Sequence, residues 1–536
     1  MPRRTSHSQT IEPAHSLMYG PNQLPIVRGQ VEAYNLLIQI SRYMEHEFNT
    51  RQKEAFCESI NKRISLIWGP PGTGKTAVLS GIILGWIENA WENDESVIIG
   101  IGANNYNAID NVLSGVIDLL AQRRIRLGAD PGSIRVTRVR SSAAQPPKDS
   151  RIEDVIRGSE DARSLVNEIQ SSSENALVIG GTWTQLGRMA ESLTGDSPNA
   201  KWFDLLVIDE ASQLPVSHAA AYFLLLKENG HVVLAGDHRQ LGPIYSFKMN
   251  NSTQGLFDCI FSYMQETHGI TPVAFECNYR MNTEISGWPR DRFYTEGYEA
   301  YFPSRKLEIT LPKPNGKPPC YWPSQLPWSD HFLRILDPDM PVVVISYGTH
   351  TSTLSNPFEA QMVASLSLLY KRTLDESYKT LTDKHFWSEC LGIVTPHRAQ
   401  MSTIRNLLIS AAGMPLDPSP FVDTVDRFQG LEREMIIASY VVADRDFVAA
   451  EEEFILEPRR FNVSLTRSRR KFIMFISDAI LQHLPFDEDV ARKAAHLQLF
   501  AEQYCDSVNE HIDLPYLDVE QANYMECFFR GRKNPQ

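Results

Sequence analysis

Short apolar runs rich in β-branched residues alternate with helical stretches along most of this chain, and this alternation restricts its fold more than any other feature. The runs are SLIW, SVIIGIG, ALVIGG, LLVIDE and VVLAGD, followed after a break by VVVIS, LGIVTP, MIIASYVV and FIMFIS. Strands that are apolar on both faces are typical of parallel sheets covered by crossover helices. The sequence therefore predicts an α/β fold with parallel sheets flanked by helices between Ile64 and Phe475.

The chain of 536 residues is too long for a single core, because hydrophobic cores stop growing near ~250–300 residues. Residues 311–328 contain six prolines, and proline continues neither a helix nor an interior strand. We therefore predict a first domain at 49–310, a Pro-rich linker at 311–340 and a second domain at 341–480.

Five other segments stand apart from the strand–helix alternation. We predict a disordered tail at 1–25, a leading helix at 26–48, a polar helical insertion at about 123–175, an insertion at 444–458 and a C-terminal extension at 481–536 that is helical and then irregular. The residues expected on one face of the leading helix are Val31, Tyr34, Leu37, Ile38, Ser41 and Met44.

Composition excludes several classes of protein. No run approaches the ~18 apolar residues of a membrane-spanning helix, and MPRRTSHSQT lacks an apolar signal region, so we expect an intracellular protein, cytoplasmic rather than nuclear. The seven cysteines form no C-x-x-C pair, which argues against zinc, iron–sulfur and disulfide frameworks. The net charge of −13 is untypical of a simple nucleic-acid binder, so any polyanion must meet a local groove. We expect a monomer.

A phosphate-binding loop follows the first apolar run. Its residues are Gly69, Pro70, Pro71, Gly72, Thr73, Gly74, Lys75 and Thr76. The loop lies between the strand at 64–68 and a helix at 77–87, as the P-loop motif requires. Backbone N–H groups and the helix N-terminus would bind the phosphates, with Lys75 on the β- and γ-phosphates and the Thr76 hydroxyl on Mg²⁺.

Two carboxylates end the run LLVIDE. Asp209 and Glu210 come directly after four apolar residues, at the carboxyl end of a buried strand, where ligands of open α/β sheets bind. Asp209 would complete the Mg²⁺ shell, and Glu210 would polarise the attacking water as the general base. Together with the P-loop, this pair predicts an ATP- and Mg²⁺-dependent hydrolase.

Six further motifs occur along the chain, the first of them upstream of the P-loop. They are NTRQ at 49–52, GDHRQLGP at 236–243, NYRM at 278–281, TPHRAQ at 395–400, DTVDRFQGLE at 423–432 and NVSLTRSRR at 462–470. Over residues 49 to 476 this order resembles the superfamily 1B helicases of the up-frameshift-like group. The resemblance implies two RecA-like P-loop NTPase domains in tandem, with one ATP contacted from both.

The resemblance also implies roles for individual residues at the nucleotide. Gln52 would read adenine, Tyr279 would stack on it, and Glu432 would meet the ribose. The other nucleotide-facing residues would be Gln240 and Arg280 at the γ-phosphate, Gln429 and Gly430 beside Glu432, and Arg467 as the arginine finger. Such a finger is worth ~10³–10⁵ in rate.

Hydroxyls and backbone groups would hold a strand by its phosphates, without reading bases. The residues that the resemblance offers for this are Asn105, Thr182, Thr395, Pro396 and Thr424. The implied activity is ATP-driven movement on, or remodelling of, single-stranded RNA or DNA, in the 5′ to 3′ direction and with a possible protein cofactor. The alternative is an ATP-driven clamp on RNA or protein that does not travel.

Overall fold

The computed structural model describes residues 13–23, 30–128, 130, 132–171, 176–194, 200–243, 258–295, 297–319, 322–348, 350–377, 381–412, 421–428, 430–518 and 521–534. The chain divides into two compact units, Met1–Glu276 (unit 1) and Cys277–Gln536 (unit 2). Each unit is built around its own sheet, as the two-domain α/β prediction requires.

Unit 1 is built around a parallel sheet with the strand order β4-β3-β5-β2-β6-β7-β1-β8 in its described residues. The strands are β1 (Ile64–Trp68), β2 (Val97–Gly102), β3 (Ile134–Arg140), β4 (Glu153–Ile156), β5 (Ala176–Gly181), β6 (Phe203–Ile208), β7 (Leu226–Gly236) and β8 (Val273–Ala274). The five apolar runs expected here form β1, β2, β5, β6 and β7, and this prediction is confirmed.

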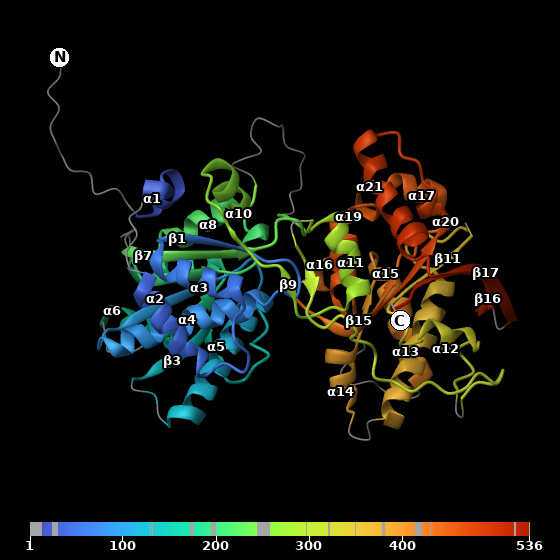
Figure 1. The fold of residues 1–536 in the computed structure, drawn as a ribbon, viewed down its shortest axis with the longest axis horizontal. Coiled ribbons are helices and arrows are strands. Elements are labelled where there is room, and N and C mark those ends of the chain that lie inside the picture. Colours follow the sequence, from blue (N-terminus) through green and yellow to red (C-terminus); the bar gives the residue numbers. More distant parts are fainter. Residues whose placement is uncertain are drawn as a thin grey trace, which may run out of the picture. The chain divides into compact units, whose positions relative to one another are not determined.

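Helices cover this sheet on both faces (Figure 1). They are α1 (Pro13–Tyr19), α2 (Gln30–Ser41), α3 (Thr50–Asn61), α4 (Lys75–Glu92), α5 (Tyr106–Leu127), α6 (Glu160–Ser171), α7 (Trp183–Thr194), α8 (Val216–Phe223) and α10 (Ile260–Ser262), with the shorter turns η1 (Pro21–Gln23), η2 (Ala211–Gln213) and η4 (Tyr263–Thr267). Helices α2 to α5 share a continuous core with the sheet, which includes Ile40, Phe56, Ile83, Ile99 and Val207.

The predicted disordered tail is wrong for residues 13–23, which form α1 and η1. Leu17 and Met18 are buried, and the Tyr263 hydroxyl donates to the Met18 carbonyl at 3.2 Å. Burial of so short a helix stabilises it where its own propensity would not. Residues 1–12 and 24–29 lie outside the described part of the chain.

The leading helix exists as α2, and its predicted buried face is confirmed in part, because Leu37 is buried in the core and Met44 packs against it. Tyr34 is 57% exposed and Ile38 is 44% exposed, whereas Leu36 and Ile40 are buried against unit 1. The prediction is therefore wrong for Tyr34 and Ile38, two large apolar residues that face solvent.

The interval 123–175 is not purely helical. After α5 the chain forms β3 and β4 before α6, and β3 pairs in parallel with β5 to extend the sheet. The run IRVTRVR carries three arginines among its apolar residues, so it lacks the continuous apolar character that marked the other strands of the sheet, although β3 lies between β4 and β5.

Unit 2 contains a mixed sheet with the order β13-β12-β14-β15-β11-β17-β16 in its described residues. The strands of the unit are β9 (Cys277–Asn278), β10 (Glu299–Ala300), β11 (Val342–Tyr347), β12 (Leu391–Val394), β13 (Val422–Asp423), β14 (Arg433–Ser439), β15 (Ser468–Ser477), β16 (Val508–Asp518) and β17 (Gln521–Arg532). The four apolar runs predicted for the second domain form β11, β12, β14 and β15, which pair in parallel.

The helices of unit 2 surround this sheet (Figure 1). They are α11 (Thr283–Arg292), α12 (His331–Ile335), α13 (Pro357–Ser377), α14 (Asp383–His385), α15 (Arg398–Ala412), α16 (Val425–Phe428), α17 (Arg445–Ala450), α18 (Glu452–Ile455), α19 (Pro458–Thr466), α20 (Asp478–Leu481) and α21 (Glu488–Leu499), with η5 (Phe386–Cys390) and η6 (Phe500–Tyr504). Within the described residues, no helix combines the length and the apolar character needed to cross a bilayer.

The division between the units lies ahead of the predicted linker. Residues 277–310 belong to unit 2, where the Asn282 amide donates to the carbonyls of Arg305 at 2.8 Å and Arg470 at 3.1 Å. The Pro-rich stretch is also part of this unit, because Leu326 is buried in its core and Trp322 and Trp328 pack against it. A stretch without regular structure is thus held by burial of its few apolar side chains.

The C-terminal extension ends in strands rather than in the predicted irregular chain. Strand β17 pairs antiparallel with β11 and with β16, so the hairpin extends the parallel part of the sheet. Its inward residues, which include Cys527 and Phe529, complete the core of unit 2. The insertion predicted at 444–458 forms α17 and α18.

Candidate active site

The phosphate-binding loop turns between β1 and α4 at the carboxyl edge of the unit 1 sheet. Gly72 and Gly74 have φ angles of 75° and 82°, a left-handed conformation that glycine adopts without strain. A Cβ at Gly74 would also lie 2.8 Å from the Gln52 amide nitrogen. The Gly69 N–H donates to the Gly236 carbonyl at 3.1 Å, which ties the start of the loop to the end of β7.

Lys75 and Thr76 form the first turn of α4. The Lys75 ammonium donates to the Gly69 carbonyl, and the buried Thr73 hydroxyl donates to the Pro70 carbonyl at 2.8 Å. These contacts hold a positive charge over the loop, beside the free N–H groups of the helix N-terminus. A phosphate group fits this combination of donors and charge.

Gln52 supports the loop from α3. It is 5% exposed, its amide nitrogen donates to the Thr73 carbonyl at 3.0 Å, and its amide oxygen accepts the Asn49 N–H at 3.0 Å in a capping box. The structure thus gives Gln52 a role in holding the loop, and its contact with adenine stays a prediction.

Asp209 and Glu210 follow β6, two strands away from β1 in the sheet. The carboxyl ends of these parallel strands share one edge, so the carboxylates lie on the side of the P-loop. Asp209 is buried, and burial, then the neighbouring Glu210, raise its pKa to about 7 although Lys75 acts in the opposite direction.

The backbone of Glu210 is left-handed, with φ 52° and ψ 37°. A non-glycine residue in this region stores strain, which accumulates at functional sites. The Gln213 amide donates to the Glu210 carboxylate at 3.0 Å and fixes the direction of the side chain. The strained turn therefore holds the Glu210 carboxylate in a fixed direction at the end of a buried strand. A general base for phosphate hydrolysis must be held in this way, because it has to orient the attacking water in line with the bond that breaks.

The donor set fits Mg²⁺ better than a metal with a full protein cage. Within the described residues, no group of three or more His, Cys, Asp or Glu side chains is placed to hold a metal ion. Magnesium keeps several waters and is bound through one or two carboxylates plus substrate phosphates. Asp209 and the Thr76 hydroxyl would hold the ion, which would neutralise phosphate charge when bound.

Gln240 follows β7 and is oriented by a residue that the sequence did not single out. Its amide nitrogen donates to Asp237 at 2.8 Å, and Asp237 also accepts the Trp68 indole N–H at 3.2 Å. The Asp237 N–H donates to the Ser212 hydroxyl at 3.2 Å. The γ-phosphate residue expected at 240 is therefore joined to the turn that follows Glu210.

In unit 2, three predicted nucleotide residues gather at the carboxyl end of α19. Arg280 forms an ion pair with Glu432 and donates to the Thr466 carbonyl at 2.8 Å. Burial alone would raise the pKa of Glu432, but Arg280 and Arg469 outweigh it and lower the pKa to about 2. Glu432 is therefore a firmly ionised acceptor between two guanidinium groups.

Arg467, the predicted arginine finger, is the C-cap of α19. It is 3% exposed and donates to the Val463 carbonyl at 3.1 Å and the Leu431 carbonyl at 3.5 Å. A cation is favourable at a helix C-terminus. The structure brings Arg467 together with Arg280 and Glu432 in unit 2, and its action on ATP stays a prediction.

The remaining residues predicted to contact the nucleotide are Tyr279, Gln429 and Gly430. The Tyr279 and Tyr301 rings lie 5.0 Å apart, so one aromatic neighbour already contacts the ring predicted to stack on adenine. Gly430 has a φ of 81° in the turn before Glu432. Gln429 lies outside the described residues.

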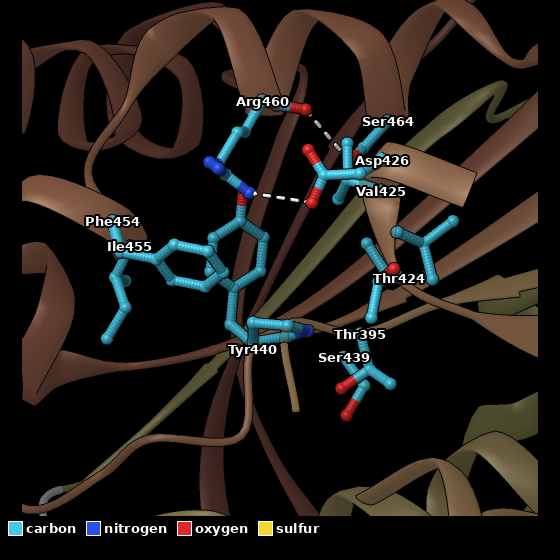
Figure 2. Close-up of a pocket in the computed structure, with 13 residues that line it drawn as sticks. Thr395, Thr424, Val425, Asp426, Ser439, Tyr440, Phe454, Ile455, Arg460 and Ser464 are labelled. Carbon is cyan, nitrogen blue, oxygen red and sulfur yellow. Dashed lines mark hydrogen bonds and ion pairs between the residues drawn. The ribbon is translucent and has the colours of Figure 1, made fainter. Parts of the chain in front are cut away.

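Three predicted strand residues line one pocket at the carboxyl ends of β12 and β13 (Figure 2). We call it the strand pocket, and its lining residues are Val394, Thr395, Pro396, Thr424, Val425, Asp426, Ala438, Ser439, Tyr440, Phe454, Ile455, Arg460 and Ser464. The Thr395 N–H donates to the Asp423 carbonyl at 3.2 Å, and the Thr395 side chain is buried.

The other wall of the strand pocket carries charge and an aromatic ring. Arg460 forms an ion pair with Asp426 at 3.0 Å, and its guanidinium lies 4.1 Å from the centre of the Phe454 ring. Figure 2 shows the Arg460 guanidinium pointing toward the Asp426 carboxylate. Hydroxyls, a cation and aromatic faces are groups that contact single strands.

The two strand residues predicted in unit 1 have local structural roles. Asn105 is the N-cap of α5, and its side chain accepts the Ala108 N–H at 3.0 Å. The Thr182 hydroxyl contacts the Thr184 hydroxyl at 3.2 Å. Both are partly exposed, and their contact with nucleic acid stays a prediction.

Comparison with known proteins finds AAA domains over most of the chain. Residues 52–247 and 256–479 each match a family model described as an AAA domain. DNA polymerase alpha-associated DNA helicase A of Saccharomyces cerevisiae is 24% identical over 511 residues, 87% of this chain and 69% of that protein. The ATP-dependent helicase upf1 of Schizosaccharomyces pombe is 26% identical over 467 residues. These matches support the up-frameshift-like group of superfamily 1 helicases as the family of this chain.

Other members of this family extend well beyond the matched region. The match with upf1 covers 81% of this chain and 45% of that protein. The human DNA replication ATP-dependent helicase/nuclease DNA2 is 24% identical over 453 residues, 80% of this chain and 36% of that protein. The chain thus spans less than half the length of these two relatives.

Two residues of the site were missed from the sequence although a signal existed. Asp237 lies inside the motif GDHRQLGP, where only Gln240 received a role. Arg469 lies in TRSRR, two positions after Arg467, and donates to Glu432 at 2.8 Å. Both residues orient a predicted site residue, and charged neighbours within the same motif are candidates for that role.

Proposed function

We propose that this chain is an ATP-dependent helicase or translocase that moves on single-stranded RNA or DNA in the 5′ to 3′ direction. The observation that carries the proposal is the joint position of Lys75, Asp209 and Glu210 at one edge of the unit 1 sheet. These are the parts that a P-loop hydrolase needs: a phosphate cradle, a magnesium ligand and a base.

In this proposal unit 1 binds and activates ATP. Lys75 and the loop N–H groups hold the phosphates, Asp209 and Thr76 hold Mg²⁺, and Glu210 takes a proton from the attacking water. The Gln213 contact keeps Glu210 in position. The charged groups of the site are already in position before the reaction. They stabilise the transition state, which carries more negative charge on its leaving oxygens than bound ATP does.

Unit 2 supplies arginines and a surface for the strand. Arg280 and Arg467 would meet charge that develops during hydrolysis, and the strand pocket would grip the backbone without reading bases. The acidic net charge of −13 does not oppose this, because such a contact is local. An inactive scaffold is disfavoured, since no residue of the hydrolytic set is replaced.

The ATPase rate with single-stranded RNA, with single-stranded DNA and with neither tests the proposal. We expect one or both polymers to raise the rate, and the ratio between them to show which is the substrate. Lys75→Ala should abolish nucleotide binding in a titration and should remove activity in all three conditions. A rate that neither polymer changes would contradict a nucleic-acid motor.

A further inference from the structure

A buried polar cluster lies at the carboxyl ends of β11, β12 and β14 in unit 2. Its members, each at most 1% exposed, are Tyr347, Asn356, Glu359, Gln400 and Ser439. Glu359, in the first turn of α13, accepts the hydroxyls of Tyr347 and Ser439 and the Val441 N–H, the last at 3.0 Å. None of these residues was assigned a role in the sequence.

The cluster surrounds a strained residue. Val441 has a φ of 70°, which is rare for any residue with a side chain and an outlier for a β-branched one. Its peptide groups are held from both sides, because its N–H donates to Glu359 and its carbonyl accepts the Asn356 amide at 3.0 Å. Strain of this kind persists only where the surroundings over-determine the backbone.

The hydrogen bonds of the cluster form one connected network. Gln400 accepts the Asn356 N–H at 2.8 Å and donates to the Ser439 hydroxyl at 3.1 Å. Asn356 donates in turn to the Tyr347 hydroxyl at 2.9 Å. Burial raises the pKa of Glu359 to about 7, although its three donors act to lower it. A buried carboxyl is costly, so an apolar core would serve simple stability better.

Along the chain, Val441 also lies between residues that line the two walls of the strand pocket. Ser439 and Tyr440 line the pocket directly before it. A few residues after it the chain enters α17 and then α18, and Phe454 and Ile455 at the end of α18 line the other wall (Figure 2). The Val441 backbone therefore sets how the second wall leaves the sheet.

We propose that Glu359 is a positioning residue for strand binding, which holds Val441 in its left-handed conformation and so fixes the two walls of the strand pocket relative to each other. This rests on the proposed function, because it needs the pocket to bind nucleic acid. Glu359 does not line the pocket or belong to the nucleotide residues, so its effect is confined to the strand.

Glu359→Gln tests the inference, because an amide has one acceptor oxygen where the carboxylate has two. One buried donor then loses its partner, and we expect the nucleic-acid concentration that gives half-maximal ATPase stimulation to rise about 10-fold. The ATPase rate without nucleic acid, the rate at saturating nucleic acid and the affinity for ATP should stay near wild type. Asp375→Asn is the matched control, an exposed carboxylate on the same helix.

A second variant separates positioning from loss of folding. Glycine adopts a φ near 70° without strain, so adding Val441→Gly to Glu359→Gln should restore half-saturation towards wild type. An unchanged half-saturation in Glu359→Gln, or a double variant no better than the single one, overturns the positioning role alone. A wild-type protein that nucleic acid neither binds nor stimulates overturns the proposed function, and this inference with it.

Discussion

Glu210 is the residue on which ATP hydrolysis depends most directly. Glu210→Gln keeps the shape of the side chain and removes the charge that a base needs. General-base catalysis contributes ~10²–10⁴-fold, so we expect turnover to fall by at least ~10² while ATP stays bound by Lys75 and the loop. Steady-state ATPase rates and retention of labelled nucleotide measure the two effects.

Asp204→Asn is the matched control for this variant. Asp204 lies on the same strand, β6, and accepts the Lys227 ammonium at 2.7 Å, near the amino end of the strand. Its loss should leave turnover close to wild type. Turnover of Glu210→Gln at the wild-type level would remove Glu210 from the catalytic role.

The raised pKa of Asp209 leads us to expect that magnesium binding depends on pH. Its pKa is raised to about 7 by burial and by Glu210, so protonation competes with the metal below that pH. We expect the affinity for Mg·ADP to fall as pH drops below 7, by up to ~10-fold per unit. Calorimetric titrations across this range measure the slope.

Two controls separate this effect from a general loss of binding. Asp209→Asn should flatten the slope, because the amide does not titrate. ADP without magnesium should show no comparable change with pH. A Mg·ADP affinity that stays constant from about pH 8 to about pH 5 would contradict a titrating metal ligand with a pKa this far above its ordinary value.

At the scale of elements, β17 is the strand that completes the unit 2 sheet. Phe529 is 1% exposed within the core, whereas Tyr524 of the same strand is 69% exposed. Removing a buried Phe side chain costs about 3–5 kcal/mol, so we expect Phe529→Ala to lower the unfolding free energy of unit 2 by that amount. Urea denaturation followed by fluorescence measures it, and Tyr524→Ala should change it little. Equal effects of the two variants would contradict a structural role for the hairpin.

The central strands were predictable because each is a continuous apolar run buried on both faces. Strands β3 and β16 were not, since β3 carries three arginines among its apolar residues and β16 carries Pro515 and three acidic residues. The pairing of β17 with β11 joins segments more than a hundred residues apart, and no local pattern indicates it. Helix α1 was missed because burial, not propensity, holds it.

The residues of the candidate site were likewise predictable only where a local sequence pattern marks them. Lys75, Asp209 and Glu210 could be predicted because each lies in a short contiguous motif after a strand. The Glu359–Val441 contact joins residues 82 positions apart, and nothing near Val441 in the sequence indicates a left-handed backbone. Tertiary hydrogen bonds impose that conformation, so only the folded chain shows it.

At the scale of the whole molecule, the chemistry is divided between the two units. Unit 1 contains the phosphate loop and the carboxylates, whereas unit 2 contains the predicted arginines and the strand pocket. Full turnover would then require both units, and nucleic acid bound to unit 2 would change hydrolysis only through a change in conformation. A motor and a clamp share this requirement, so the response to nucleic acid alone does not distinguish them.

The length of the strand does distinguish them. A translocase takes many steps before it leaves a long strand, so we expect the ATPase rate per bound protein to rise with strand length and then level off. A clamp hydrolyses ATP in place, and its rate would depend only on occupancy. Homopolymers of increasing length, each at saturating concentration, measure this. Lys75→Ala gives the background at every length. A rate that is the same on short and long strands would contradict translocation and leave ATP-driven clamping as the function.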